Sequence, residues 1–144
     1  MEYHTGHKFG QSLYNQCRGI DERVVNPNRI RKSLSVEETF VKDISNISDS
    51  LEQIRLLYIE LLRRIGKSTV NRPIKSQSIK IKFNNFKQVT AELAAKHPDL
   101  DTYIALFNQI YAKYGIPIRL LGIGVHFDNN QKINYQLSLF KNAK

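Results

Sequence analysis

Residues 78–93, SIKIKFNNFKQVTAEL, decide the fold of this chain. In the first half of this stretch every second residue is apolar, which is the period of a strand with one buried face. Asn84-Asn85 predicts a hairpin turn, because asparagine tolerates positive φ. The return strand covers roughly residues 87–93, and a bulge near Phe86 is needed to bring its apolar residues to the buried face. The inward residues are then Ile79, Ile81, Phe83, Val89 and Ala91, and the outward residues are Lys80, Lys82, Gln88 and Thr90.

An amphipathic helix is predicted on each side of this hairpin in the sequence. Apolar residues recur at helical spacing from Leu51 to Ile65 and again from Leu100 to Tyr114. The expected boundaries of the first helix are Ser48 or Ser50 as N-cap, with a Ser50–Gln53 capping box, and Gly66 as the stop; those of the second are Asp99, Gly115 and Pro117.

Two further strands complete the pattern. They are predicted from Ser33, where Leu34, Val36 and Phe40 are apolar, and over residues 118–127, IRLLGIGVHF. The element order is therefore β-α-β-β-α-β, an α+β fold. We predict a four-stranded antiparallel sheet with two helices on one face and the other face open.

The composition points to one domain with a polyanionic partner. The 144 residues are 41% hydrophobic, and 22 Lys and Arg residues against 13 acidic ones give a formal net charge of +9. Cys17 is the single cysteine, so no internal disulfide can form. The sequence has neither an apolar run near the ~20 residues of a membrane span nor a signal peptide, which predicts a cytoplasmic chain without a membrane partner.

The predicted open face is polar and basic. It consists of Ser33, Ser35, Glu37, Thr39, Lys80, Lys82, Gln88, Thr90, Gly122 and Gly124, and Arg119 can reach its rim. Lysines and hydroxyls bind phosphates without reading bases, and glycines let another backbone approach closely. Solvation alone also requires a polar face, but a basic segment at 18–32 feeds the same sheet. Because large aromatic residues are lacking, we expect contact with the backbone of a duplex rather than stacking on single-stranded bases.

Four stretches, in order, resemble the little finger domain of bacterial DNA polymerase IV, a Y-family translesion polymerase. They are YNQCRGIDERVV at 14–25, RIRKSLSVEETF at 29–40, SIKIKFNNFKQVT at 78–90 and IRLLGIGV at 118–125 followed by QLSLF. The resemblance implies residues 1–20 as the end of the thumb domain, 21–32 as a basic linker, 33–128 as the little finger domain and 129–144 as a tail.

The same resemblance implies the partners and the residues that meet them. Duplex template–primer DNA would lie against Arg29, Arg31, Lys32, Ser33, Ser35, Thr39, Lys80, Lys82, Thr90, Arg119, Gly122 and Gly124. Some relatives carry additional arginines in the last strand where this chain has Leu120 and Gly124, which predicts fewer contacts there. The remaining polymerase domains are further partners, and the chain is expected to be monomeric.

The peptide Gln136-Leu137-Ser138-Leu139-Phe140 is similar to the pentapeptide by which bacterial polymerases bind the β sliding clamp. An extended peptide can place Leu139 and Phe140 in an apolar pocket while Gln136 hydrogen-bonds at its rim. The alternative is a further edge strand with Ile133, Tyr135, Leu137 and Leu139 on one side. The polar spacer before the peptide favours the clamp.

No catalytic centre is evident in the sequence. Polymerase chemistry needs carboxylates that hold two Mg²⁺ ions, whereas the acidic residues here are scattered, and His4 and His7 lack further ligands. We therefore expect a non-catalytic piece without a cofactor, and the resemblance implies a parent DNA polymerase that uses Mg²⁺. Two alternatives remain: a free-standing RNA-recognition domain, which predicts aromatic residues on the open face, and a small ferredoxin-like enzyme, which predicts a loop cluster of Arg or His.

Overall fold

The computed structural model describes residues 6–27, 30–68 and 72–128 of the chain, which divides into two compact units, Met1–Ile30 and Arg31–Lys144. In the first unit, helix α2 covers His7–Gln16. Its side chains Phe9 and Tyr14 are exposed, in line with the thin apolar stripe of this segment. Whether residues 1–20 are the end of a thumb domain stays a prediction.

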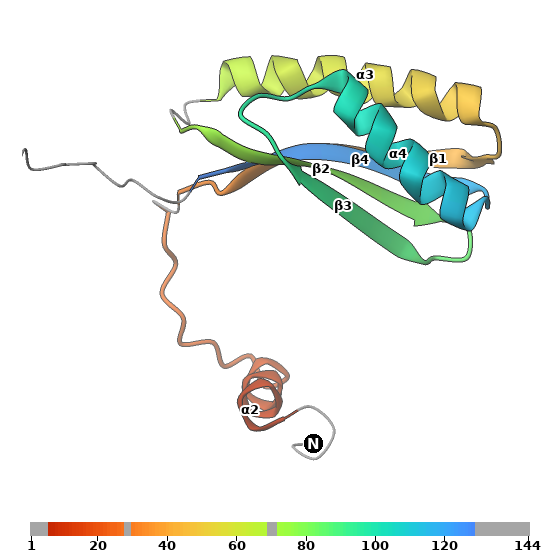
Figure 1. Cartoon of the computed structure of the whole chain (residues 1–144). Coiled ribbons are helices and arrows are strands. Elements are labelled where there is room, and N and C mark those ends of the chain that lie inside the picture. The colour runs from red at the N-terminus through yellow and green to blue at the C-terminus, as the bar shows by residue number, and fades with distance from the viewer. Residues whose placement is uncertain (1–5, 28–29, 69–71, 129–144) are drawn as a thin grey trace, which may run out of the picture. The chain divides into compact units, whose positions relative to one another are not determined.

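The second unit has the predicted element order. Its elements are β1 (Ser33–Ile44), α3 (Ile47–Lys67), β2 (Ile74–Phe83), β3 (Gln88–Ala94), α4 (Leu100–Tyr114) and β4 (Ile118–Phe127). The four strands form one antiparallel sheet in the order β1-β4-β2-β3. Both helices lie on the same side of this sheet (Figure 1), so the predicted fold is confirmed.

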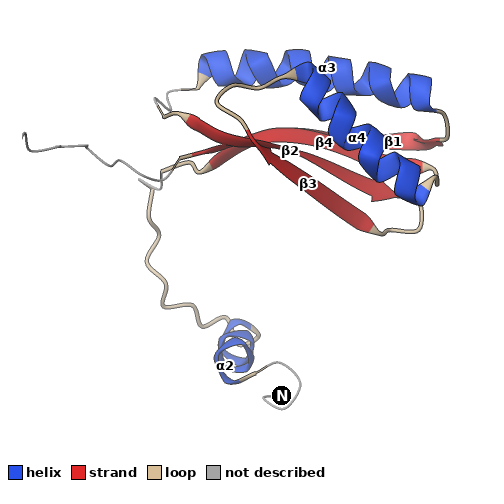
Figure 2. Ribbon diagram, viewed as in Figure 1, coloured by secondary structure: helices blue, strands red, loops and turns tan. Residues whose placement is uncertain are grey.

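Helices α3 and α4 cover one face of the sheet (Figure 2), and the hydrophobic core consists of buried residues from both helices and from β1, β2 and β4. Apolar stripes of α3 and α4 face the inward residues of β2 and β4, and the largest fully buried side chains include Ile54, Leu61, Phe83, Tyr103, Phe107, Ile81 and Leu121. This burial accounts for the stripes seen in the sequence. Because side chains alternate along a strand, every second residue of each strand is directed away from the core, toward the face without helices.

The N-terminus of α3 differs from the prediction. The N-cap is Asn46, whose side-chain oxygen accepts a hydrogen bond from the backbone N–H of Asp49 at 2.7 Å. Ser50 lies inside the helix, where its buried hydroxyl donates to the Asn46 carbonyl at 2.9 Å. The Ser48 or Ser50 cap was therefore wrong. Asparagine caps a helix as well as serine does, and the structure places the cap at Asn46, two residues after β1 ends at Ile44.

Three other ends of helices and strands also differ from the prediction. Gly66 does not stop α3, which continues through Lys67. Strand β1 extends beyond Phe40 to Ile44, and β2 begins at Ile74, four residues before the predicted hairpin stretch at 78–93. The reason is tertiary: Ile44 pairs with Ile118, and Ile74 pairs with Phe127.

The second helix and the hairpin agree with the prediction. Asp99 caps α4 by accepting from the backbone and hydroxyl of Thr102, and these hydrogen bonds lower the pKa of the Asp99 carboxyl. Gly115 ends the helix in the left-handed region with φ 58°. Phe86 has φ 64°, and Lys82 pairs with Gln88, so the predicted bulge is present.

Candidate nucleic-acid interface

The face of the sheet away from α3 and α4 carries four cross-strand rows of residues. In the strand order β1, β4, β2, β3 the rows are Ser33, His126, Ser76 and Ala94; Ser35, Gly124, Ser78 and Glu92; Glu37, Gly122, Lys80 and Thr90; and Thr39, Leu120, Lys82 and Gln88. All ten residues assigned to the open face from the sequence lie in these rows. We call these four rows the open face.

The sequence reasoning missed six members of the open face. They are His126, Ser76, Ala94, Ser78, Glu92 and Leu120. Each of them lies two or four positions along the same strand from a residue that was assigned to the face. The two-residue period of a strand would therefore have identified them, had the strand ends been known. Glu92 adds a second carboxylate to the face and accepts a hydrogen bond from the Ser76 hydroxyl. The open face is therefore less uniformly basic than predicted.

An ion pair crosses the centre of the open face. Glu37 on β1 and Lys80 on β2 are separated by β4, yet the lysine ammonium contacts the carboxylate. The pair spans the strand above Gly122, which is buried, and a Cβ at Gly122 would lie 2.9 Å from the Glu37 Cβ and 3.5 Å from the Lys80 Cε. Because Gly122 has no side chain, the two charged side chains can meet above β4. A phosphate that binds Lys80 has to compete with the Glu37 carboxylate.

Gly124 has close neighbours on both faces of the sheet. On the open side, a Cβ would lie 2.9 Å from the Leu34 carbonyl oxygen and 2.9 Å from the Ser35 Cβ. On the core side, the buried Tyr103 hydroxyl donates to the Gly124 carbonyl at 2.9 Å, and burial raises the pKa of Tyr103. The close approach that a glycine permits is therefore used within the sheet itself, by β1.

Gly124→Ala is expected to destabilise the domain by about 1–3 kcal/mol, because the new methyl group meets backbone atoms of β1 that cannot rotate away. Gly66→Ala is the matched control. A Cβ there has nothing within 4 Å, and because Gly66 lies in the last turn of α3, alanine should be neutral or stabilise by up to about 1 kcal/mol. Urea denaturation of both variants measures the difference. Equal stability of the two would contradict the crowding seen around Gly124.

Arg119 reaches the open face through a second irregularity of the sheet. Lys82 pairs with Leu120 and Phe83 pairs with Ile118, so Arg119 is one extra residue in β4. A bulge of this kind redirects a side chain. The Arg119 guanidinium lies 3.8 Å from the Asp43 carboxylate and 5.4 Å from the centre of the Phe86 ring. Arg119 therefore lies beside the same ring that Lys82 contacts, and its role at the DNA face stays a prediction.

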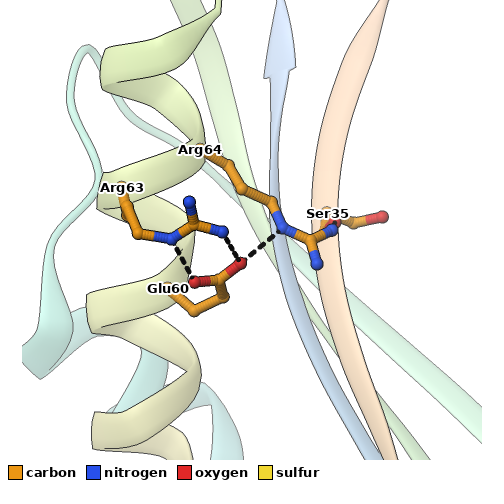
Figure 3. Close-up of polar contacts among 4 residues, drawn as sticks. All are labelled: Ser35, Glu60, Arg63 and Arg64. Carbon is orange, nitrogen blue, oxygen red and sulfur yellow. Dashed lines mark hydrogen bonds and ion pairs between the residues drawn. The ribbon is translucent and has the colours of Figure 1, made fainter.

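Basic side chains continue around the outer edge of β1. Glu60 on α3 accepts two hydrogen bonds from Arg63, each 2.6 Å, and one from Arg64 at 2.8 Å (Figure 3). These hydrogen bonds lower the pKa of Glu60 to about 2. Arg64 also donates to the Ser35 carbonyl at 3.4 Å and so covers part of an edge strand. The resulting depression is lined by Arg31, Ser33, Leu34, Ser35, Arg63, Arg64, Lys67 and Ser68.

Two of the three basic residues predicted before β1 lie among the described residues. Arg31 and Lys32 are exposed, and the Lys32 carbonyl accepts from the Phe127 N–H at 2.8 Å, which ties this segment to the sheet. Arg29 and the peptide Gln136–Phe140 lie outside the described residues. In the described part of the chain, no group of three His, Cys, Asp or Glu residues is arranged to hold a metal ion. None of the described helices is both long enough and apolar enough to span a membrane.

Comparisons with known proteins agree on one family. The model of the impB/mucB/samB family C-terminal domain matches residues 31–139. The chain is 42% identical over 128 residues to DNA polymerase IV of Legionella pneumophila (strain Corby), which covers 89% of the chain and 36% of the relative. It is 37% identical over 132 residues to DNA polymerase IV of Pseudomonas entomophila, covering 92% of the chain and 37% of the relative. The chain thus spans little more than a third of the length of these relatives.

Solved structures share the fold. A structure described as the complex of the beta-clamp processivity factor and the little finger domain of PolIV matches with a TM-score of 0.64 and 31% identity, over 74% of this chain and 97% of that one. A Y-family DNA polymerase chimera matches with a TM-score of 0.60 and 15% identity, over 87% of this chain and 36% of the chimera. The second likeness concerns the fold alone.

Proposed function

This chain belongs to the impB/mucB/samB family of C-terminal domains, the little finger domain of Y-family DNA polymerases such as polymerase IV, and from that premise we propose that its open face grips the backbone of duplex template–primer DNA. The observation that supports this most directly is the open face itself. Its four rows bring Lys80 and Lys82 together with the hydroxyl groups of Ser35, Thr39, Ser78 and Thr90, and Arg119 lies beside the Phe86 ring that Lys82 also contacts. Such a surface binds phosphates with little regard for sequence.

The wider role follows from the same premise. The parent protein would be a DNA-directed DNA polymerase that copies damaged templates with errors, and Mg²⁺ would be held by carboxylates in its other domains. This domain would be an accessory piece that acts in the bacterial cytoplasm as part of one polypeptide. The tail peptide Gln136–Phe140 would bind the β sliding clamp; a relative of 31% identity is described in complex with the clamp, which supports that assignment.

A binding titration at two salt concentrations tests the proposal. The partners to compare are a DNA duplex, a second duplex of unrelated sequence and a single-stranded RNA. Phosphate gripping requires equal affinity for the two duplexes and a steep fall with salt. Preference for the RNA would instead favour an RNA-recognition domain. The open face argues against that alternative, because within its four rows the single aromatic ring is the imidazole of His126.

Glu37→Gln is expected to raise duplex affinity, because it frees Lys80 from the carboxylate that a phosphate has to displace. Exposed ion pairs are worth about 0.2–1 kcal/mol, which predicts an increase of roughly 1.5- to 5-fold. Glu38→Gln is the matched control, since it removes the same charge from the neighbouring position, which belongs to the opposite face of β1.

The comparison of the two variants decides between a local and a general effect of charge. A gain for Glu37→Gln that disappears in a Lys80→Ala background would localise the competition to this pair. Equal gains for Glu37→Gln and Glu38→Gln would show that the ion pair has no part in it.

A further inference from the structure

Phe86 occupies a backbone position at which a bulky residue is strained. The Phe86 N–H donates to the Phe83 carbonyl at 2.9 Å, and the Phe83 N–H donates to the Lys87 carbonyl at 2.9 Å. These bonds enclose a three-residue hairpin loop whose last residue takes the left-handed region, a place that normally favours glycine or asparagine. Among the described residues other than glycine, Phe86 alone has positive φ, at 64°. The adjacent Asn84 and Asn85 would bear that conformation at less cost, yet neither adopts it.

Burial does not compensate for this strain. The Phe86 side chain is 64% exposed at the end of the sheet. The ring contacts two cations, with the Lys82 Nζ at 5.0 Å and the Arg119 Cζ at 5.4 Å from its centre. Strained residues that the core does not require tend to occur at functional positions. Strain, exposure and two flanking cations thus coincide at this one residue.

We propose that Phe86 is a stacking platform for an unpaired DNA base, with Lys82 and Arg119 holding the phosphates beside that base. An exposed aromatic ring next to a cationic track is the arrangement that binds single-stranded nucleic acid, and stacking is worth about five- to a hundredfold in affinity per base. Bases inside a duplex are already stacked and cannot use the ring. The inference rests on the proposed duplex binding and extends it: this end of the open face recognises a junction between duplex and single strand. It also revises our expectation that no base stacking would occur.

The test compares a blunt duplex with a duplex of equal length that carries a single-stranded overhang. The full chain should bind the overhang substrate at least fivefold more tightly. Phe86→Gly should abolish that preference and leave the Tm equal to or above that of the wild type, because glycine relieves the left-handed strain. Phe86→Leu keeps the strain and the apolar bulk but lacks the ring, so the preference should be lost without a gain in Tm.

The outcomes separate this inference from the proposed function. If the wild-type chain binds both substrates equally, or if Phe86→Gly keeps the preference, the stacking platform is refuted while duplex binding stands. A preference that survives in Phe86→Leu would replace stacking by simple apolar contact and overturn the inference. If the chain binds neither substrate at any salt concentration, both the platform and the proposed function fail.

Discussion

Raising the salt concentration from 50 to 200 mM is expected to weaken duplex binding by several hundredfold. Five cations in the described residues lie on the open face or lead into it: Arg31, Lys32, Lys80, Lys82 and Arg119. If each neutralises one phosphate, the slope of log K against log salt is about −4.5, and a fourfold rise in salt then lowers affinity by roughly 500-fold. Fluorescence anisotropy with a labelled duplex measures the slope directly.

Single substitutions measure how much each residue contributes to the salt dependence of binding. Lys82→Ala and Arg119→Ala should each reduce its magnitude by about one unit. Arg55→Ala is the matched control, since it removes an exposed cation from α3, on the helix-covered side of the sheet. A slope near zero would exclude phosphate gripping as the mode of binding. A loss for Arg55→Ala equal to that of Lys82→Ala would show that overall charge, not the open face, drives association.

Replacement of both Leu139 and Phe140 by alanine is expected to lower affinity for the β sliding clamp by at least about a hundredfold. Each apolar anchor buried in the clamp contributes about 1.5–3 kcal/mol before ordering costs, so the loss of two approaches the whole binding energy of a short peptide. Surface plasmon resonance with immobilised clamp measures the effect. Duplex binding should not change, because the open face lies in a different part of the chain.

Ser138→Ala is the control for the clamp experiment, since it alters the same peptide without removing an anchor. Its affinity for the clamp should stay within about twofold of the wild type, as expected for a residue outside the binding hot spot. Unchanged clamp binding after removal of residues 136–144 would show that the tail is not the docking peptide. That result would favour the alternative, in which the same residues form a further edge strand.

The faces of the helices and strands were predictable because they depend on local periodicity. Alternation in residues 78–83 and 118–127 placed Ile81 and Leu121 in the core and Lys80 and Gly122 outside it. Such patterns follow from the repeat of the backbone and need no knowledge of neighbours. The bulge at Phe86 was predictable for the same reason, since the two strands of the hairpin could share a face in no other way.

Boundaries were less predictable where several residues could serve. Ser45, Asn46, Ser48 and Ser50 can all cap a helix, and the folded chain uses Asn46, which follows the end of β1 at Ile44 by two residues. The extra lengths of β1 and β2 depend on pairing with Ile118 and Phe127, which are distant in sequence. Local pattern carries no information on such pairs, so these strand ends appeared only in the folded chain.

The amino-acid sequence by itself determined the element order, the two faces of the sheet and the family to which the chain belongs. Only the tertiary structure decided which outward residues meet. It inserted β4 between β1 and β2, so that Glu37 reaches Lys80 across Gly122, and it placed Arg119 and Lys82 against the ring of Phe86. The physical reason is that periodicity assigns a side chain to a face, whereas its neighbours on that face depend on strand order and register, which are set by long-range packing.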